Sequence, residues 1–453
     1  MPALQRLCLE ERTYRTWEEE SSSSRQKAEK KQIPHPVQKA NGIRNDIFVL
    51  PRIGKARALE TCREMFTLYS QGCFLKDLTS TGLAHRKKRG KRKTMKKISL
   101  LVLSLATLVL SGTFALPVLG QTATAPYKLS VFATAPAGLS APDSVIVLHD
   151  HVFVGYGDGH LPDGSDGLNS QVVDFKMDGS VAYIYTVPGH NDGLKVDPNT
   201  HLLWALQNED ASPNLVIINT ETHQQKLYTF GPTPHGGGYD DMVFRDCKVY
   251  ISASNPANNP NTGPGIVSAR LEGSTVAVEP VLAGTASAID IPTDATITLN
   301  LQDPDSMTLD PLGNIVLDSQ GDQELIIVSN PGPNQRVLHL PLSYQTSSGP
   351  MSVEVDDTAF VTSSQGFLLF ADKGLNTVYT ISKQAFAPGT AYTAADGGPF
   401  IGRLDMTTGV ITPIVTGVSN PGGMVFVDTS KHFGDDFQKE DGDACRDRGW
   451  DSH

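Results

Sequence analysis

The stretch DPDSMTLDPLGNIVLDSQGDQELIIV, from Asp303 to Val328, decides the fold. It contains three short runs of alternating apolar residues, each bounded by Gly, Pro, Asn or Asp. This pattern is typical of β-strands joined by tight turns. The first run begins with Pro304-Asp305, and recurrence of this start at a fixed spacing would indicate a repeated structural unit.

The same start recurs along the second half of the chain. The six copies are PDSVIV at Pro142, NDGLKV at Asn191, YDDMVF at Tyr239, PDSMTL at Pro304, VDDTAF at Val355 and PGGMVF at Pro421. Their aligned second positions are Asp143, Asp192, Asp240, Asp305, Asp356 and Gly422. Successive intervals of 49, 48, 65, 51 and 66 residues suit four-stranded units with insertions in the third and fifth.

Further strands follow each start in a constant order. Second strands are predicted in HVFVGYG, HLLWALQ, KVYISAS, NIVLDSQ and GFLLFAD, and hairpins in NLVIINTETHQQKLYTF, GIVSARLEGSTVAVEPVL and FIGRLDMTTGVITPIVTG. We therefore predict an all-β, six-bladed β-propeller with four-stranded antiparallel blades over residues 121–429. A two-sheet sandwich is the alternative, but it does not explain the repeated Asp.

Closure of the ring is the weak point of this prediction. The sixth start, PGGMVFVD, is followed only by a charged tail, and YKLSVFATA from Tyr127 can add one outer strand. Two recognisable strands remain, so we expect a final blade that is incomplete because strands are missing from the C-terminus. The alternatives are closure by the insertion around Ala385 to Pro399, or five full blades with a composite seam.

Two segments carry a family resemblance. Asp303 to Val328, together with GFLLFADKGLNTVYTI (Gly366 to Ile381), resembles NHL-type repeats. The region from Tyr127 to Asp428 is similar to the six-bladed propellers that include NHL and SMP-30/gluconolactonase-like proteins. The resemblance implies the architecture. The lactonase branch holds a divalent metal with a Glu, an Asn and an Asp; here Asp143 replaces the Glu and Gly422-Gly423 lacks a carboxylate, so no catalytic residue is carried over.

The charge distribution separates two kinds of sequence. Lys and Arg exceed Asp and Glu by 23 to 10 up to Gly120, and the remainder has 15 against 39, which together give the net charge of −11. Met95-Lys-Lys, the apolar ISLLVLSLATLVL and the small residues after it form a signal-peptide pattern. We expect residues 1–94 to be a basic segment that is disordered or a gene-model extension, residues 95–120 a signal peptide, and residues 430–453 a charged disordered tail.

The alternative for Ile98 to Leu119 is a membrane anchor with a basic cytoplasmic tail. Either way the acidic part is exported, so the expected localisation is secreted or periplasmic, with no stable membrane association after signal cleavage. Only Cys247 and Cys445 follow the signal, so at most one disulfide is available there, and Cys247 is expected to be a small buried thiol.

Candidate site residues lie in the loops before the innermost strands, which open on the channel face. The candidate ligand-binding residues are His190, Asn191, Asp192, His235, Asp240, Asp305 and Asp356. The alternative is a structural role, in which each repeated Asp accepts hydrogen bonds from the N–H groups of its own turn. His190 and His235 could pair as metal ligands or as an acid and a base, or could be ordinary loop histidines.

A second candidate is the glycine-rich loop that begins at Gly155. It concentrates Asp158, Asp163 and Asp166, which are candidate metal ligands, but the spacing is not that of an EF-hand. A flexible acidic surface loop is the alternative.

The sequence predicts a secreted propeller that acts as a binding or scaffold module holding polar ligands or cations on its channel face. The candidate cofactor is Ca²⁺ or another divalent cation, and the candidate partners are a small polar ligand, a glycan or a protein. The acidic charge argues against nucleic acid as a partner. The alternative function is a metal-dependent hydrolase or lactonase of the SMP-30-like type that uses the same face, and catalytic residues are not assigned.

Overall fold

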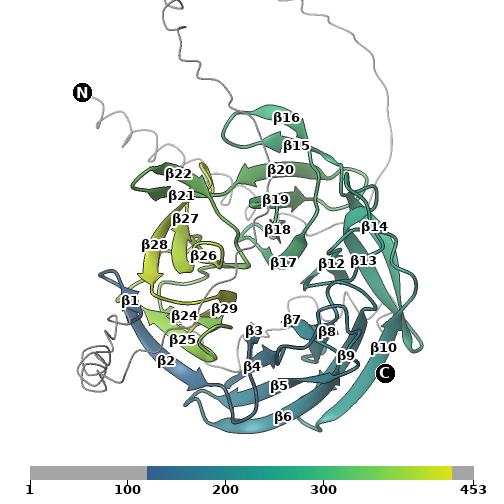
Figure 1. Cartoon of the computed structure of the whole chain (residues 1–453), viewed down its shortest axis with the longest axis horizontal. Helices are drawn as coiled ribbons and strands as arrows, with labels where there is room; N and C mark the ends of the chain where they lie inside the picture. Colours follow the sequence, from purple (N-terminus) through teal and green to yellow (C-terminus); the bar gives the residue numbers. More distant parts are fainter. Residues whose placement is uncertain (1–119, 431–453) are drawn as a thin grey trace, which may run out of the picture. The chain divides into compact units, whose positions relative to one another are not determined.

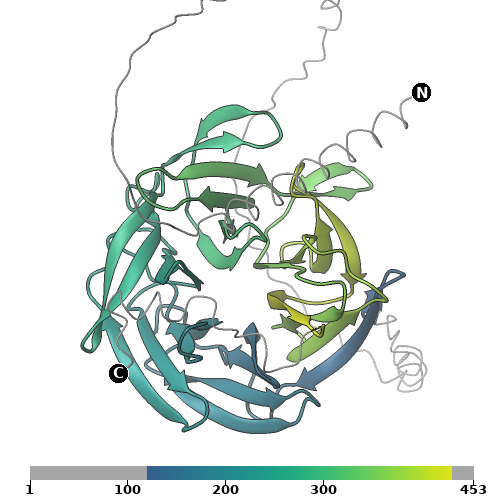
Figure 2. The same cartoon turned by 180° about the vertical axis from the view of Figure 1, so that it is seen from behind.

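The computed structural model describes residues 120–430, and in this range the chain is all-β. The sheets are arranged around a central axis, as Figure 1 shows from one face and Figure 2 from the other. Because residues 120–430 contain no helix, none of them forms one long and apolar enough to cross a membrane. Residues 1–119 and 431–453 lie outside the described residues, and they hold the predicted basic segment (1–94) and all but one residue each of the predicted signal peptide (95–120) and tail (430–453).

The first three blades follow the chain in order, from the innermost strand outwards. Blade 1 comprises β3 (Pro142–Leu148), β4 (His151–Tyr156), β5 (Asn169–Lys176) and β6 (Val181–Pro188). Blade 2 comprises β7 (Asn191–Val196), β8 (Leu203–Gln207), β9 (Asn214–Asn219) and β10 (Gln224–Phe230). Blade 3 comprises β11 (Met242–Arg245), β12 (Lys248–Ser252), β13 (Pro264–Glu272) and β14 (Thr275–Ala283). A short parallel pairing of β10 with β14 joins blades 2 and 3.

Blades 4 and 5 carry extra hairpins on their outer strands (Figure 1). Blade 4 comprises β17 (Pro304–Leu309), β18 (Ile315–Ser319), β19 (Glu324–Ser329) and β20 (Arg336–Pro341), with the hairpin β15 (Ser287–Asp290) and β16 (Ala295–Thr298) on β20. Blade 5 comprises β23 (Asp357–Phe360), β26 (Ala391–Ala395), β27 (Phe400–Leu404) and β28 (Val410–Thr416). Its outer strand also pairs with β1 (Thr122–Ala123) and with the hairpin β21 (Ser343–Thr346) and β22 (Gly349–Ser352).

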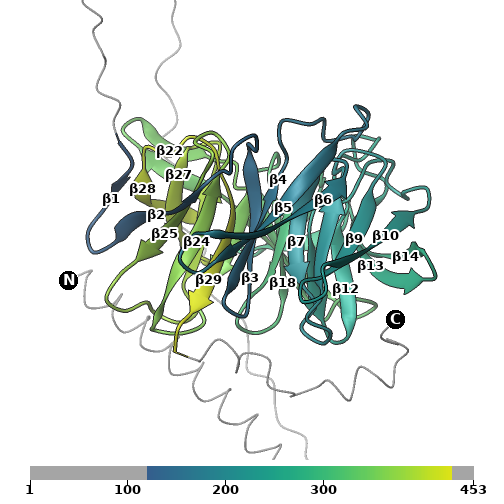
Figure 3. The same cartoon turned by 90° about the horizontal axis from the view of Figure 1, so that it is seen from below.

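Blade 6 closes the ring with four strands drawn from three parts of the chain. From the inside outwards they are β29 (Pro421–Asp428), β24 (Gly366–Asp372), β25 (Thr377–Ser382) and β2 (Lys128–Thr134). The β24–β25 hairpin leaves the chain of blade 5 between β23 and β26 and pairs with β29 on one side and β2 on the other (Figure 3).

This arrangement corrects two expectations. GFLLFAD is β24 of blade 6, so it is not the second strand of the fifth unit. The blade expected to be incomplete has four strands, and the segment around Ala385 to Pro399 supplies β26 of blade 5 instead of closing the seam. The six inner starts and the insertions in the third and fifth units are confirmed. The insertions are the hairpins β15–β16 and β24–β25.

The hydrophobic core consists of six clusters of buried residues, one at each interface between neighbouring blades. Alternate residues of one strand serve two interfaces: Leu369 of β24 packs towards blade 1, and Phe370 packs towards blade 5. Both side chains are fully buried, and burying such a side chain contributes about 1.5–3 kcal/mol. The packing therefore independently places β24 in blade 6. Cys247, in the turn before β12, is disulfide-bonded, which corrects the expectation of a buried thiol.

Candidate functional site

The five repeated aspartates lie at one mouth of the central channel. They are 4–8% exposed and all line the same cavity: Asp143, Asp192, Asp240, Asp305 and Asp356. Three of the inner strands shift register around this position, between Pro142 and Val145, Asn191 and Leu194, and Pro304 and Met307. A register shift takes a residue out of the ladder and re-aims its side chain. The repeated start is therefore the sequence signature of an irregular strand end that faces the channel.

We call this set, with Gly422 at the sixth position, the aspartate ring. The side chains of Asp143, Asp192, Asp240 and Asp305 follow one another closely enough for each to influence the pKa of the next. Within the described residues these carboxyl groups contact one another rather than the N–H groups of their own turns. The turn-capping interpretation of the repeated Asp is therefore wrong for the ring.

Burial is the main cause of the raised pKa values of the ring aspartates. It raises the pKa of Asp143 to about 7 and the pKa of Asp356 to about 6, although Lys373 opposes the rise in both. Burial also raises the pKa of Asp192, and it raises those of Asp240 and Asp305 well above the ordinary value, with neighbouring carboxylates adding to the effect. Near neutral pH the ring therefore holds protons that a cation could replace.

Lys373 fills the sixth position of the ring. It follows β24, and its Nζ lies 2.9 Å from Oδ2 of Asp143 and 3.0 Å from Oδ2 of Asp356. Burial acts to lower the pKa of Lys373, but the two carboxylates outweigh it and raise that pKa well above its ordinary value. A Cβ at Gly422 would lie 2.8 Å from both Asp143 Oδ1 and Lys373 Cε, so the glycine leaves the space that the lysine occupies.

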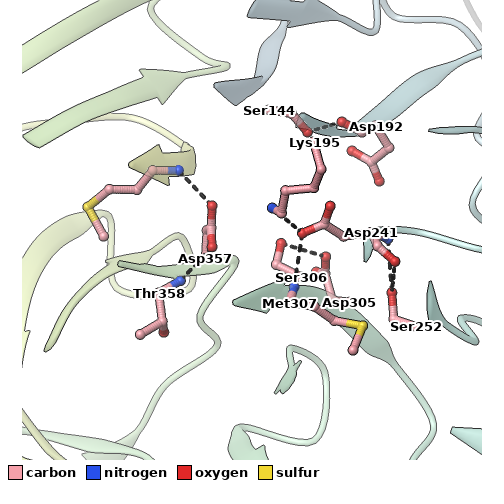
Figure 4. A network of polar contacts seen from close by, with 11 residues as sticks. Ser144, Asp192, Lys195, Asp241, Ser252, Asp305, Ser306, Met307, Asp357 and Thr358 are labelled. Atoms are coloured by element: carbon pink, nitrogen blue, oxygen red, sulfur yellow. Dashed lines mark hydrogen bonds and ion pairs between the residues drawn. The ribbon is translucent and has the colours of Figure 1, made fainter. Parts of the chain in front are cut away.

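A second layer of polar contacts, next to the ring on the inner strands, joins neighbouring blades (Figure 4). The links are Ser144 Oγ to the carbonyl of Asp192, Met307 N–H to Asp241 Oδ2 at 3.0 Å, and Met424 N–H to Asp357 Oδ2 at 2.7 Å. They join blades 1 and 2, blades 3 and 4, and blades 5 and 6. This layer explains the doubled Asp of YDD and VDD as a device that fixes neighbouring blades.

One oxygen of the second layer has no protein partner among the described residues. Asp241 Oδ2 accepts from Lys195 Nζ at 2.6 Å, whereas Asp241 Oδ1 has no hydrogen-bond donor. The residue is 3% exposed and lines the same cavity as the ring. A buried carboxylate oxygen without a donor costs free energy unless a ligand or water satisfies it.

Two groups of convergent ligand atoms lie on the blade 1 to 3 side of the ring. They are Asp143, His190 and Asp192, and Asp192, Glu209 and Asp240, and within each group the ligand atoms lie within 4.8 Å of one another. Burial lowers the pKa of His190, which leaves its imidazole neutral near pH 7 and able to bind a metal. The all-carboxylate group suits Ca²⁺ or Mg²⁺, and the group with His190 suits a transition metal as well.

Two other predicted residues have structural roles. Asn191 is fully buried, and its Nδ2 donates to the carbonyl of Leu206 at 2.9 Å. His235 Nε2 donates to the carbonyl of Gly238 at 2.7 Å, and its ring lies 5.3 Å from that of Tyr239. In the part of the chain that the structure describes, His235 belongs to neither ligand group, so the structure does not pair it with His190.

The three carboxylates of the glycine-rich loop after Gly155 accept hydrogen bonds from backbone N–H groups, two of them within the loop and one before β3. Asp158 accepts from Ser140 N–H and Asp163 from Ser165 N–H, while Asp166 accepts from the N–H groups of residues 161 and 168. Among residues 120–430 no ligand group contains these three aspartates. The contacts favour an acidic loop with internal turn caps over a cation site.

Comparison with known proteins shows no family for this chain. No protein-family model and no curated protein matches the chain. Among solved structures it is similar to virginiamycin B lyase from Staphylococcus aureus, at 11% identity and a TM-score of 0.38, over 63% of this chain and 87% of that one. It is also similar to a 6-phosphogluconolactonase-like protein from Bacteroides uniformis, at 11% identity and a TM-score of 0.37, over 65% and 90%. At this identity and TM-score the two neighbours do not single out the NHL or SMP-30 families.

Proposed function

We propose that this propeller binds a divalent cation at the channel mouth, on the side formed by blades 1 to 3. The observation that carries the proposal is the position of Asp192, which belongs to both groups of convergent ligand atoms. Its carboxylate is 7% exposed and contacts Asp143 on one side and Asp240 on the other. A cation bound beside Asp192 in either group would therefore contact ligands from two neighbouring blades.

The charge of the cavity supports a cation as the ligand. Seven aspartates line it, five in the ring and two in the second layer, against the two ammonium groups of Lys195 and Lys373. Buried carboxylates in such excess hold protons, as the raised pKa values of the ring indicate, or they hold metal ions. The unpartnered Oδ1 of Asp241 is a further oxygen in the same cavity that a cation or its water shell would satisfy.

The biological role that we propose is that of a secreted binding or scaffold module of the NHL/SMP-30-like class. The export pattern after Met95 and the repeat starts support this role. A bound cation with open coordination positions would hold a polar ligand, such as a sugar hydroxyl or a carboxylate, over the channel.

The test is cation binding by the full-length chain after treatment with a chelator. Titration calorimetry with Ca²⁺, Mg²⁺ and Mn²⁺ should show one site, and Asp192→Asn should weaken binding by at least about tenfold, equivalent to about 1.4 kcal/mol. Asp178→Asn is the control, because Asp178 caps an exposed turn between β5 and β6. Absence of binding by the unaltered protein, or equal weakening by both substitutions, would refute the proposal.

The hydrolase alternative has one observation in its favour. His190 is a neutral imidazole within the ligand group of Asp143 and Asp192, where it could act as a base for a metal-activated water. A panel of lactones and esters, assayed with and without chelator, distinguishes the two functions. Hydrolysis that chelator abolishes and that His190→Gln removes would identify an enzyme, and cation binding without hydrolysis would identify a binding module.

A further inference from the structure

We infer that Lys373 is a tethered cation that occupies the half of the aspartate ring between blades 5 and 1, and so confines an external cation to the half formed by blades 1 to 3. The inference rests on the proposed cation site and adds a residue that determines how many cations the ring takes and where.

The geometry around the ammonium group is that of a bound ion. Lys373 Nζ lies about equally far from Asp143 Oδ2 and Asp356 Oδ2, at 2.9 and 3.0 Å. Those two carboxylates are 6% and 4% exposed and come from blades 1 and 5, whereas the lysine comes from blade 6 between them. The lysine therefore lies where a cation shared by the carboxylates of blades 1 and 5 would lie.

Gly422 leaves the space that the Lys373 side chain occupies at this position. The other five blades place an aspartate here, and blade 6 places the residue with no side chain. A Cβ at Gly422 would lie 2.8 Å from Lys373 Cε and 2.8 Å from Asp143 Oδ1, closer than such atoms approach. The sixth position therefore has the ammonium group of Lys373 where the other blades have a carboxylate. Compared with a sixth ionised aspartate, this changes the local charge by two units.

The two halves of the ring differ because of this lysine. On the blade 1 to 3 side, Asp192, Glu209 and Asp240 have convergent oxygens with no ammonium among them. On the other side, Asp356 is paired with Lys373 and belongs to neither ligand group of the described residues. Asp143 contacts both halves, since Oδ2 pairs with Lys373 while the carboxylate also belongs to the group with His190.

The experiment replaces the tethered cation and counts Ca²⁺ ions bound to the full-length chain by titration calorimetry. We expect one Ca²⁺ for the unaltered protein and for Lys373→Arg, and two for Lys373→Met. The double variant Lys373→Met/Asp356→Asn should return to one, because the second site needs both carboxylates. Lys248→Met, which removes an exposed lysine of β12, is the control and should bind one.

Thermal unfolding with and without Ca²⁺ covers the case in which Lys373→Met folds poorly. The variant should lose stability without Ca²⁺ and regain it in Ca²⁺, whereas the control should show only the stabilisation by Ca²⁺ that the unaltered protein shows. If Lys373→Met still binds one Ca²⁺ and Ca²⁺ restores none of the lost stability, the inference is wrong and the proposed cation site stands. If the unaltered protein binds none and Lys373→Met binds one, Lys373 still occupies a cation position, but the proposed function and the confinement of a cation to blades 1 to 3 both fail.

Discussion

The affinity of the ring for a divalent cation should depend steeply on pH. Burial raises the pKa of Asp143 to about 7. A carboxyl group with that pKa is about nine-tenths ionised at pH 8 and about one-tenth ionised at pH 6. Because the cation binds only the deprotonated form, its affinity should rise with pH and level off above the pKa. This group alone makes binding about tenfold weaker at pH 6 than at pH 8.

The second carboxylate of the same group increases the effect. The pKa of Asp192 is also raised by burial, and Asp192 contacts Asp143, so the two protons are coupled. Displacing both protons would make the loss of affinity between pH 8 and pH 6 larger than for Asp143 alone. A loss of at least about tenfold, equivalent to about 1.4 kcal/mol, is therefore the expectation for the unaltered protein.

Calorimetry in two buffers with different ionisation enthalpies measures both quantities. The affinity for Ca²⁺ gives the pH dependence, and the difference between buffers gives the number of protons released, expected to be between about one and two at pH 6. Asp163→Asn is the control, since Asp163 is exposed, its pKa is lowered by hydrogen bonds to Ser165, and it should leave the profile unchanged. Equal affinity at pH 6 and pH 8 without proton release would show that the ring is already ionised and would refute the argument.

Two substitutions test other parts of the structure. Gly422→Ala would place a methyl group 2.8 Å from Asp143 Oδ1 and should lower the free energy of unfolding by about 1–3 kcal/mol; a urea unfolding curve that superimposes on that of the unaltered protein would contradict this. His339 is hydrogen-bonded at 2.8 Å to both Asp290 and Glu324; burial acts to lower its pKa, but these carboxylates raise it. Its stabilisation is complete below the ordinary pKa of about 6.5 and is lost as pH rises through the raised one. His339→Asn should therefore cost more at pH 6, about 2–4 kcal/mol, than at pH 9, and equal costs by denaturant titration would exclude the charged pair.

The architecture could be predicted because one local pattern recurs. Each inner strand repeats the same start, and in three of them the aligned Asp marks a register shift at the channel. The predicted residues that gather at the mouth, Asp192, Asp240, Asp305 and Asp356, all belong to that pattern. Alternation and turn residues are properties of a few adjacent positions, so a single sequence is enough to find them.

The seam and the charge of the ring could not be predicted in the same way. The alternation of β24 and β25 is the same whether the hairpin pairs within blade 5 or crosses to blade 6, and only long-range packing decides between them. Lys373 carries no local signal, because its partners Asp143 and Asp356 lie far from it in the sequence. The sequence shows that Gly422 replaces the repeated Asp. Only the fold shows that Lys373 occupies the space that this glycine leaves.

The crossing of β24 and β25 also bears on how such a ring can evolve. Propellers gain or lose blades most simply when each blade is one contiguous segment that can be duplicated or deleted. Here the chain of blade 5 is interrupted by two strands of blade 6, so no single cut removes one blade and leaves the other whole. A single duplication or deletion would have to include blades 5 and 6 together, whereas each of blades 1 to 4 is one contiguous segment. The number of blades in the propeller is thus constrained at blades 5 and 6, the side from which Lys373 enters the aspartate ring.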